Sequence, residues 1–455
     1  MKFLAIITFG IIIHACTQYE NDDTPKNIIL FISDGCGYNH IDATSMYQYG
    51  KRGMQIYEKF PVKYAVSTYS AGGEGYDPQQ AWQNFKYVLN KPTDSAASGT
   101  AMATGIKTYN GAISVDTTKK EIQIIAERAE QLGKSSGVVS SVLFSHATPA
   151  CFAAHNTSRG NYKDIAQEMI LESKLDIIMG CGHPLFDNDG KETPDTSYRA
   201  VGGMELWTTL NEGKAGNDAD GDGETDYWTL IQDRNEFQAL VQGDTPKRII
   251  GIPKVRSTLQ LSRSGEPNTD PFTVPFLENI PNLAEMTAAA LNVLDNNQNG
   301  FFLMVEGGAV DWASHGNHSG RMIEEEIDFN KAVEAAVDWV SKNSNWNETL
   351  VIVTADHETG YLNGPGSGLE DKLSEGGIEA VWTPLVSKGQ GNLPDMEWHS
   401  GGHSNSLIPL YAKGAGSKLF KEYADEVDPV RGKYIDNTEI GQVMFRLWGV
   451  SISSL

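Results

Sequence analysis

Short apolar runs that alternate with helical stretches constrain the fold of this chain more than any other feature of its sequence. The runs are rich in β-branched residues and apolar on both faces, as are the strands of a parallel sheet covered by helices. They comprise residues 26–33, 136–144, 175–180, 300–305 and 349–354. The helical stretches between them comprise residues 121–132, 282–294 and 321–343. This order predicts one α/β domain with a three-layer α/β/α arrangement around a mostly parallel central sheet.

Two segments interrupt the alternation. Residues 185–280 are rich in Gly, Asp, Asn, Thr and Pro, and residues 361–400 are rich in Gly, Ser and Glu. Neither has a hydrophobic pattern that would support a core of its own, so we expect both to be loop insertions on the rim of the sheet. The domain itself is expected to comprise residues 26–455.

Residues 1–16 have the features of an export signal. A single lysine precedes an apolar run from Phe3 to Ile13, which is too short to span a bilayer. The tetrapeptide that ends at Cys16 resembles a bacterial lipobox, in which the cysteine is lipidated and begins the mature chain. An ordinary signal peptide that contains a cysteine is the alternative. With residues 17–25 as a polar tether, we expect a periplasmic or cell-surface lipoprotein that contacts the membrane only through this anchor.

Net charge and cysteine content narrow the function classes. A formal net charge of -23 argues against a nucleic-acid-binding surface. The excess of carboxylates suits both solubility outside the cell and cation binding. Beyond Cys16, the chain has Cys36, Cys151 and Cys181 with no CxxC pair, so buried thiols are expected rather than a thiolate metal site.

Polar residues follow several of the apolar runs. In open α/β sheets, ligands bind beyond the carboxyl ends of the strands. The residues found there are Asp34, His146, Thr148, Glu306, Asp311, His315, Asp356 and His357. Each alone could be a turn, cap or core residue, but four strands that end this way are hard to explain by turn chemistry. Because mixed carboxylate and imidazole ligands suit Zn²⁺ and all-oxygen sets suit Mg²⁺, the sequence predicts more than one ion.

The stretch "PTDSAASGTAMATG", residues 92–105, predicts a helix of small residues that packs closely against its neighbours. Ser95 would lie where this helix begins. It would be either a helix cap or a nucleophile at the positive end of the helix, where free backbone N–H groups favour phosphate.

Six motifs together resemble the alkaline phosphatase family, in the family's order from about residue 26 to residue 414. They are "NIILFISDGCG", "TDSAASGTAMATGIKTYNGAISVD", "HATPACFAAHNTSR", "FFLMVEGGAVDWASH", "VTADHETG" and "HSNSLIPLYAKG". The resemblance implies hydrolysis of small phosphate monoesters, with Ser95 as the nucleophile that forms a phosphoserine intermediate before inorganic phosphate is released. It also allows for a homodimer.

The resemblance further implies three metal sites and a phosphate clamp. Asp34, Asp356 and His357 would hold the zinc that activates Ser95. Asp311, His315 and His403 would hold a second zinc, and His403 is preferred to His399 because its distance from "YAKG" matches the family. Glu306 and Thr148 would hold Mg²⁺, with Asp34 bridging. Arg159 would bind two phosphate oxygens through its planar fork.

Two positions depart from the best-known bacterial members, which carry Asp and Lys where this chain has His146 and Trp312. A smaller bacterial group has the His and Trp pair. Because His146 is too long and too neutral to replace a carboxylate directly, we expect it to contact Mg²⁺ through water. Trp312 would either stack on the organic group of a substrate or simply wall the pocket.

A second motif, "NDADGDGETDYW", resembles a DxDxDG calcium loop. Its carboxylates are those of Asp218, Asp220, Asp222 and Asp226. It is not an EF-hand, because the twelfth position is Thr229 rather than Glu. A structural calcium site and a solvated acidic turn are the two interpretations.

Other functions fit the sequence less well. A sulfatase would need a C/S-x-P-x-R motif, which "TDSAAS" lacks. A phosphodiesterase of the same superfamily would usually have Thr as its nucleophile and would lack the motif around Arg159. A surface lipoprotein that only stores or senses metal on a degenerate phosphatase fold would be favoured by a missing zinc ligand. All of the expected zinc ligands are present in this sequence.

Overall fold

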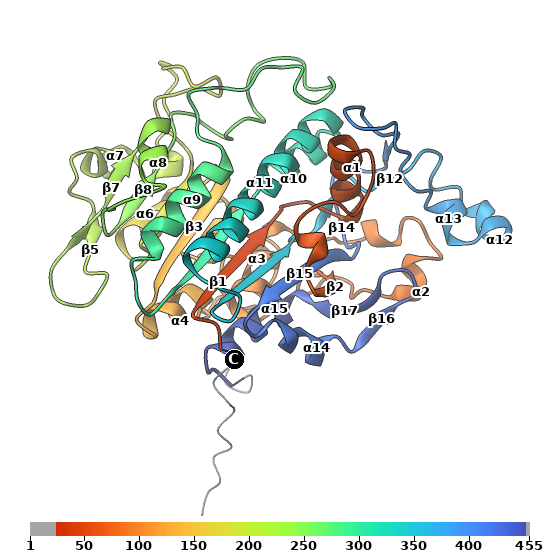
Figure 1. Ribbon diagram of the computed structural model, residues 1–455, viewed down its shortest axis with the longest axis horizontal. Coiled ribbons are helices and arrows are strands. Elements are labelled where there is room, and N and C mark those ends of the chain that lie inside the picture. Colours follow the sequence, from red (N-terminus) through yellow and green to blue (C-terminus); the bar gives the residue numbers. More distant parts are fainter. Residues whose placement is uncertain (1–23, 452–455) are drawn as a thin grey trace, which may run out of the picture.

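The computed structural model describes residues 24–451, and its centre is an eleven-stranded sheet (Figure 1). In spatial order its strands are β16 (Glu426–Asp428), β17 (Gly432–Asp436), β2 (Val62–Ser67), β15 (Ile408–Gly414), β10 (Thr349–Thr354), β1 (Asn27–Ile32), β9 (Phe301–Glu306), β3 (Ser135–Leu143), β4 (Ile177–Cys181), β8 (Ile249–Gly251) and β7 (Thr229–Ile231). From β10 to β7 all neighbours pair in parallel, whereas β15 is antiparallel to both of its neighbours. The prediction of a mostly parallel sheet is confirmed.

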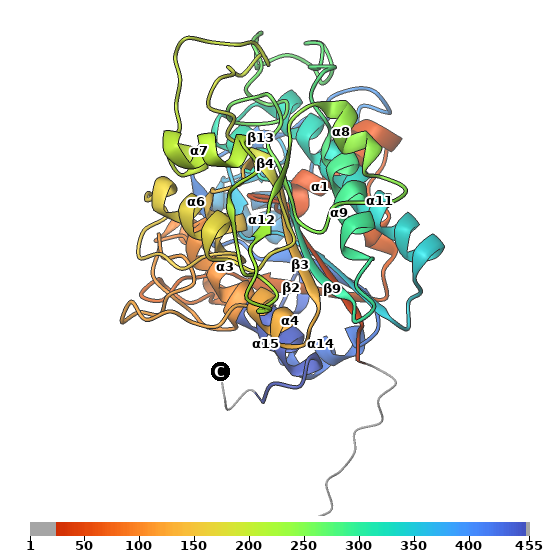
Figure 2. The ribbon, with the colours of Figure 1, turned by 90° about the vertical axis from the view of Figure 1, so that its left-hand side faces the viewer.

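Helices cover both faces of the sheet. Figure 2, which views the sheet from its side, shows α9 and α11 on one face and α3 and α6 on the other. The helices of four or more residues are α1 (Tyr38–Tyr49), α2 (Pro78–Ala81), α3 (Ser95–Thr104), α4 (Ile125–Gln131), α5 (Ala147–Cys151), α6 (Tyr162–Leu171), α7 (Met204–Asn211), α8 (Arg234–Ala239), α9 (Leu283–Leu294), α10 (Ala309–His315), α11 (Ser319–Asn343), α12 (Leu373–Gly376), α13 (Ile378–Val381), α14 (Phe420–Tyr423) and α15 (Asn437–Leu447). The three-layer α/β/α prediction is therefore confirmed. Within residues 24–451, no helix is long and apolar enough to span a bilayer.

The predicted strands and helices differ from the observed ones mainly at their ends. Strands β1, β9 and β10 are buried along their whole length, which explains their uniformly apolar sequences. Helix α4 begins at Ile125 rather than at residue 121, because Glu121 forms a β-bridge with Val115. The side chain of Glu127 then accepts a hydrogen bond from the backbone N–H of Ile124, and this fixes the start of the helix.

Residues 185–280 are more than the loop that their composition suggests. They contain α7 and α8, and they extend the sheet at one edge by β8 and β7. Trp228 and Phe237 are buried in the main hydrophobic core. Strands β7 and β8 are only three residues long, so no clear apolar run in the sequence predicts them.

Residues 361–400 form a smaller unit at the rim. They contain α12, α13 and the short strands β12 (Leu362–Asn363) and β13 (Glu397–Trp398). Tyr361 and Val381 form a small apolar cluster with Phe85 and Val88, separate from the main core. Part of this cluster comes from residues 81–88, which are far from residues 361–400 in the sequence. A local hydrophobic pattern therefore could not predict it.

Small residues allow helix α3 to pack closely on both sides, as predicted. All ten of its residues are buried. A Cβ atom on Gly99 would lie 3.1 Å from Sγ of Cys151 in α5. A Cβ atom on Gly441 of α15 would lie 2.6 Å from the backbone N of Gly105, too close for any side chain. The first residue of α3 is thereby held in one place against the end of the sheet.

Candidate active site

The predicted ligand residues lie together at the carboxyl ends of three neighbouring strands. Asp34 follows β1, Glu306 ends β9, and Asp356 and His357 follow β10. The parallel register pairs Ile32 of β1 with the last residue of each neighbouring strand. The three strands therefore end at the same level, and the side chains that follow them meet there.

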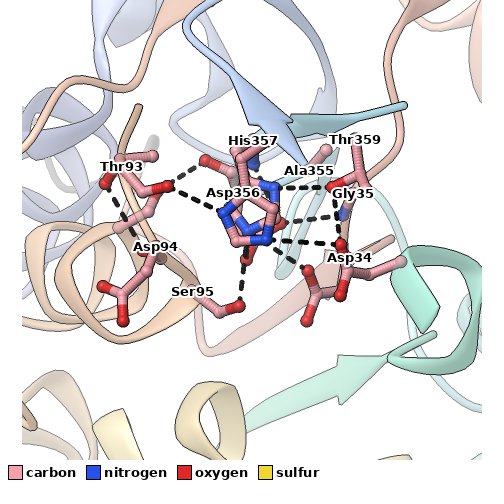
Figure 3. A network of polar contacts seen from close by, with 12 residues as sticks. Asp34, Gly35, Thr93, Asp94, Ser95, Ala355, Asp356, His357 and Thr359 are labelled. Atoms are coloured by element: carbon pink, nitrogen blue, oxygen red, sulfur yellow. Dashed lines mark hydrogen bonds and ion pairs between the residues drawn. The ribbon is translucent and has the colours of Figure 1, made fainter. Parts of the chain in front are cut away.

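Asp34, Asp356 and His357 form the first group, and all three are fully buried. Each offers an atom that lies within 4.8 Å of the others. His357 Nε2 lies 3.5 Å from Asp34 Oδ1 and 3.2 Å from Asp356 Oδ2. The backbone N–H of Gly35 donates to Asp356 Oδ1 at 3.0 Å, which orients this carboxylate (Figure 3).

Asp311, His315 and His403 form the second group. Asp311 and His315 are four residues apart on α10, and His403 Nε2 lies 3.1 Å from His315 Nε2. Nδ1 of His315 contacts the carbonyl oxygen of Gly401, and Nδ1 of His403 contacts that of Thr93, both at 2.8 Å. Because a carbonyl can only accept, both Nδ1 atoms must donate. Each Nε2 lone pair is then free to bind a metal ion.

Asp34, His146 and Glu306 form the third group. The hydroxyl of Ser140 on β3 donates to Glu306. His146 Nε2 lies 3.2 Å from the guanidinium of Arg159, which can only donate, so Nε2 must be the acceptor. Thr148, two residues after His146, lies in α5.

Ser95 is the first residue of α3 and lies beside the first group (Figure 3). Its Oγ is 3.3 Å from His357 Nε2. The helix cap is the preceding residue, Asp94, whose Oδ1 accepts from the backbone N–H of Ala97 at 2.9 Å. Oδ2 of Asp94 pairs with Arg159 at 3.0 Å. The cap is thus Asp94, and the hydroxyl of Ser95 remains available for chemistry.

The carboxylates of the site are strongly perturbed by burial and by one another. Burial, and then the charges of Asp356 and Asp311, raise the pKa of Asp34 well above its usual range. Burial raises the pKa of Glu306 to about 7. Burial, and then the nearby His403, lower the pKa of His357 well below its usual range. So many buried acidic groups lie together only if they are protonated or if positive charge compensates them.

Several polar atoms of the site have no hydrogen-bond partner among the described residues. They are both carboxylate oxygens of Asp34, Oδ2 of Asp356, Oε1 of Glu306, Oγ1 of Thr148 and Nδ1 of His146. Buried polar atoms are rarely left in this state unless an ion or water binds them. The first two groups offer the nitrogen and oxygen ligands that suit Zn²⁺, and Glu306 with Thr148 offers the oxygen ligands that suit Mg²⁺. The residues present therefore fit divalent metal ions.

An α/β sheet that gathers such ligands around a serine at a helix N-terminus defines a metal-binding hydrolase. A family model described as alkaline phosphatase matches residues 25–375. The chain belongs to the alkaline phosphatase family, whose members use metal ions, and it is a phosphomonoesterase.

Relatives and solved structures agree with this assignment. Alkaline phosphatase 3 of Bacillus subtilis is 28% identical over 94% of this chain and 89% of its own length. The alkaline phosphatase of Escherichia fergusonii is 32% identical over 90% of this chain and 85% of its own length. The alkaline phosphatase from the Antarctic bacterium TAB5 is 26% identical with a TM-score of 0.63, over 94% of this chain and 99% of its own. A variant of that enzyme, in which aspartate replaces a histidine, has Mg bound in a site called M3.

Two further residues touch the predicted ligands and were missed by sequence reasoning. The hydroxyl of Thr359 donates to Asp311 Oδ1 at 2.5 Å and lies 3.3 Å from His357 Nδ1, so it links the first two groups. Ser140 holds Glu306. Ser140 is one of three serines in the apolar run 136–144, and these polar residues were the only signal. Thr359 lies two residues beyond His357, but nothing in the sequence distinguishes it from an ordinary turn residue.

The other histidines of residues 24–451 lie outside the three groups. His399 packs edge-on against Phe85, with 5.0 Å between ring centres, and His318 is the residue before α11. His40 is buried in α1, and a ring nitrogen lies 3.1 Å from the carbonyl oxygen of Thr359.

The acidic loop only partly matches its prediction. Asp218, Asp220 and Asp226 have carboxylate oxygens within 4.8 Å of one another, but Asp222 is outside this group. Lys247 Nζ lies 2.6 Å from Asp220 and 2.8 Å from Asp226. An ammonium group therefore already neutralises part of the loop. The carboxylate of Asp222 instead accepts from the backbone N–H of Glu224.

Proposed function

We propose that this phosphomonoesterase transfers the phosphoryl group of its substrate to Ser95 and then to water. The observation that carries this proposal is the place of Ser95 Oγ, which is buried at the start of α3 and 3.3 Å from His357 in the first group of ligands. As the bond from Oγ to phosphorus forms, the bond from phosphorus to the alcohol oxygen breaks. Water then attacks the phosphoserine, and this step releases inorganic phosphate and restores the serine hydroxyl.

We propose two zinc sites and one magnesium site. Asp34, Asp356 and His357 would hold one zinc, and Asp311, His315 and His403 the other, while Glu306 and Thr148 with Asp34 would hold magnesium. Bound zinc ions would supply positive charge that lowers the pKa of a nearby hydroxyl or water and stabilises negative oxygens. The first zinc site and the magnesium site are supported by the buried, unpartnered oxygen atoms described above. The second zinc site is supported by the Nε2 atoms of His315 and His403, which lie 3.1 Å apart beside Asp311.

The chain's own groups would bind and orient the phosphate. The N-terminus of α3 presents free backbone N–H groups and the positive end of the helix dipole at Ser95. Arg159 is held by Asp94 on one side and faces His146 on the other. Its planar fork retains N–H groups that can bind two phosphate oxygens. Asp94 therefore has two roles, because the same carboxylate caps the helix and orients the clamp.

Replacing Ser95 with alanine tests the nucleophile. We expect Ser95→Ala to lower turnover of p-nitrophenyl phosphate by at least roughly a thousandfold, as removal of a nucleophile does in other hydrolases. Acid quenching with labelled substrate should leave phosphate bound to the wild-type protein and none bound to the variant.

Ser98→Ala is the matched control for this experiment. Ser98 lies on the same helix, but its hydroxyl donates to the carbonyl oxygen of Asp356 at 2.7 Å. The labelled phosphoprotein should therefore still form in Ser98→Ala. Label retained in Ser95→Ala would show that another residue accepts the phosphoryl group.

We propose that His146 weakens the magnesium site because it offers no negative charge. The magnesium bound to the TAB5 variant with aspartate in place of a histidine supports this proposal. His146→Asp should tighten Mg²⁺ binding by about tenfold or more in a calorimetric titration, because a carboxylate is a hard oxygen ligand. His146→Asn, which has a similar shape and no charge, should give no such gain. Equal affinities in all three proteins would place His146 outside the magnesium site.

Export and lipid anchoring remain proposals, because residues 1–16 lie outside the described residues. Strand β1 begins at Asn27, at the opposite end of the strand from Asp34. An anchor at Cys16 would therefore attach on the side of the sheet away from the site, which would leave the site open to small substrates in the periplasm or outside the cell. Mass spectrometry of the mature protein should find a lipidated Cys16 at the N-terminus, and an unmodified or different N-terminal residue would contradict the anchor.

The homodimer that the family resemblance allows also remains a prediction.

We also propose a calcium ion at the acidic loop. Asp218, Asp220 and Asp226 could provide its oxygen ligands, but the ion would have to compete with Lys247. The ion would have a structural role, since the loop residues around it offer no nucleophile. Anomalous diffraction from crystals grown with calcium would decide it, and the absence of a peak among the three carboxylates would leave Lys247 as their partner.

A further inference from the structure

Aromatic and cationic side chains line the rim of the candidate site beyond His146. The ring centre of His146 lies 5.4 Å from that of Trp312 and 6.2 Å from that of Tyr162. Trp312 and Tyr162 are both partly exposed. The guanidinium of Arg199 lies over the ring of Tyr162, at 4.4 Å from its centre. A row of contacting side chains thus extends from His146, which contacts Arg159, through Tyr162 to Arg199.

Arg199 is fixed in place but has few partners. It is exposed, and one of its Nη atoms donates to the carbonyl oxygen of Gly160 at 2.7 Å. Gly160 directly follows Arg159, so Arg199 is bound to the stretch of chain that carries Arg159. No carboxylate of residues 24–451 lies within ion-pair distance of Arg199. The guanidinium therefore keeps N–H groups for a ligand, in a chain whose net charge is -23.

The position of Arg199 suits recognition of the substrate's alcohol part. Stacking on Tyr162 and the bond to Gly160 hold its planar group in one orientation, so little side-chain entropy is lost when a ligand binds. A strongly negative protein repels substrates with several negative charges, and a local unpaired arginine offsets this repulsion. A planar guanidinium binds phosphate or carboxylate oxygens through paired N–H groups.

We propose that Arg199 forms a second anion site, so that the preferred substrates are phosphomonoesters whose alcohol part carries a further phosphate or carboxylate group. The reacting phosphate would lie between Ser95 and Arg159, and the second anion would lie beyond Tyr162, against Arg199. This inference rests on the proposed function, because it requires the phosphate to react at Ser95. Trp312 and Tyr162 would provide the surface between the two anions.

Matched substrates measure this preference. We define selectivity as kcat/KM for fructose 1,6-bisphosphate divided by kcat/KM for fructose 6-phosphate. A second pair, glycerate 3-phosphate and glycerol 3-phosphate, differs only by a carboxylate in place of a hydroxymethyl group. Selectivity should exceed two for the fructose pair, because the bisphosphate carries two hydrolysable phosphates, and should exceed one for the glycerate pair. Both values should fall with added salt, because the contact with an exposed arginine is screened.

Arg199→Gln should lower selectivity by about tenfold, the scale of one charge-assisted hydrogen bond. Arg199→Lys should retain part of the wild-type selectivity, because the charge is kept although the planar fork is lost. Lys214→Gln is the charge control, since it removes an exposed positive charge from the same segment 185–280, where Lys214 pairs with Glu212. Unchanged selectivity in Arg199→Gln, or an equal fall in Lys214→Gln, would overturn the inference.

Failure of this inference can be told apart from failure of the proposed function. If Ser95→Ala retains turnover of the singly phosphorylated substrates, the proposed function fails. If Ser95→Ala is inactive and Arg199→Gln has wild-type selectivity, only the second anion site fails.

Discussion

Burial of several carboxylates at one edge of the sheet is the constraint on which the rest of this structure depends. Asp34, Glu306 and Asp356 are fully buried, and no lysine or arginine of residues 24–451 lies within ion-pair distance of any of them. A buried charge that loses its partner costs about 3–5 kcal/mol. The fold can hold these groups together only if they are protonated or bind cations. Their unpartnered oxygens and the adjoining imidazoles make divalent metal ions the natural solution.

The helix that begins at Ser95 connects this charged edge with the substrate. Its small residues let α5 and α15 approach closely, and this packing fixes the start of the helix. The hydroxyl of Ser98 donates to the carbonyl oxygen of Asp356 and accepts from the side chain of Asn437 at 2.9 Å. The helix is thereby tied both to the end of β10 and to α15. At its start, Asp94 caps the helix and orients Arg159, so the serine, the clamp and the ligand strands form one connected unit.

Much of this could be predicted from sequence because the information was local. Apolar runs marked the buried parallel strands, and the residues just after them marked the candidate site. What escaped prediction depends on contacts between distant segments. Strands β7 and β8 are too short to show a pattern, and Thr359 gains its place only when α10 packs against the turn after β10. Lys247 meets the acidic loop in the same way, and Arg199 reaches the rim of the site only through Tyr162 and Gly160.

The central proposal is that these buried carboxylates and the adjoining imidazoles hold metal ions beside Ser95. Anomalous diffraction recorded on both sides of the zinc absorption edge, from crystals of the protein as purified, tests it most directly. We expect two zinc peaks, one among Asp34, Asp356 and His357 and one among Asp311, His315 and His403. We also expect non-anomalous density for a lighter ion beside Glu306. If crystals of fully active protein gave no zinc peak in either group, this result would contradict the proposal.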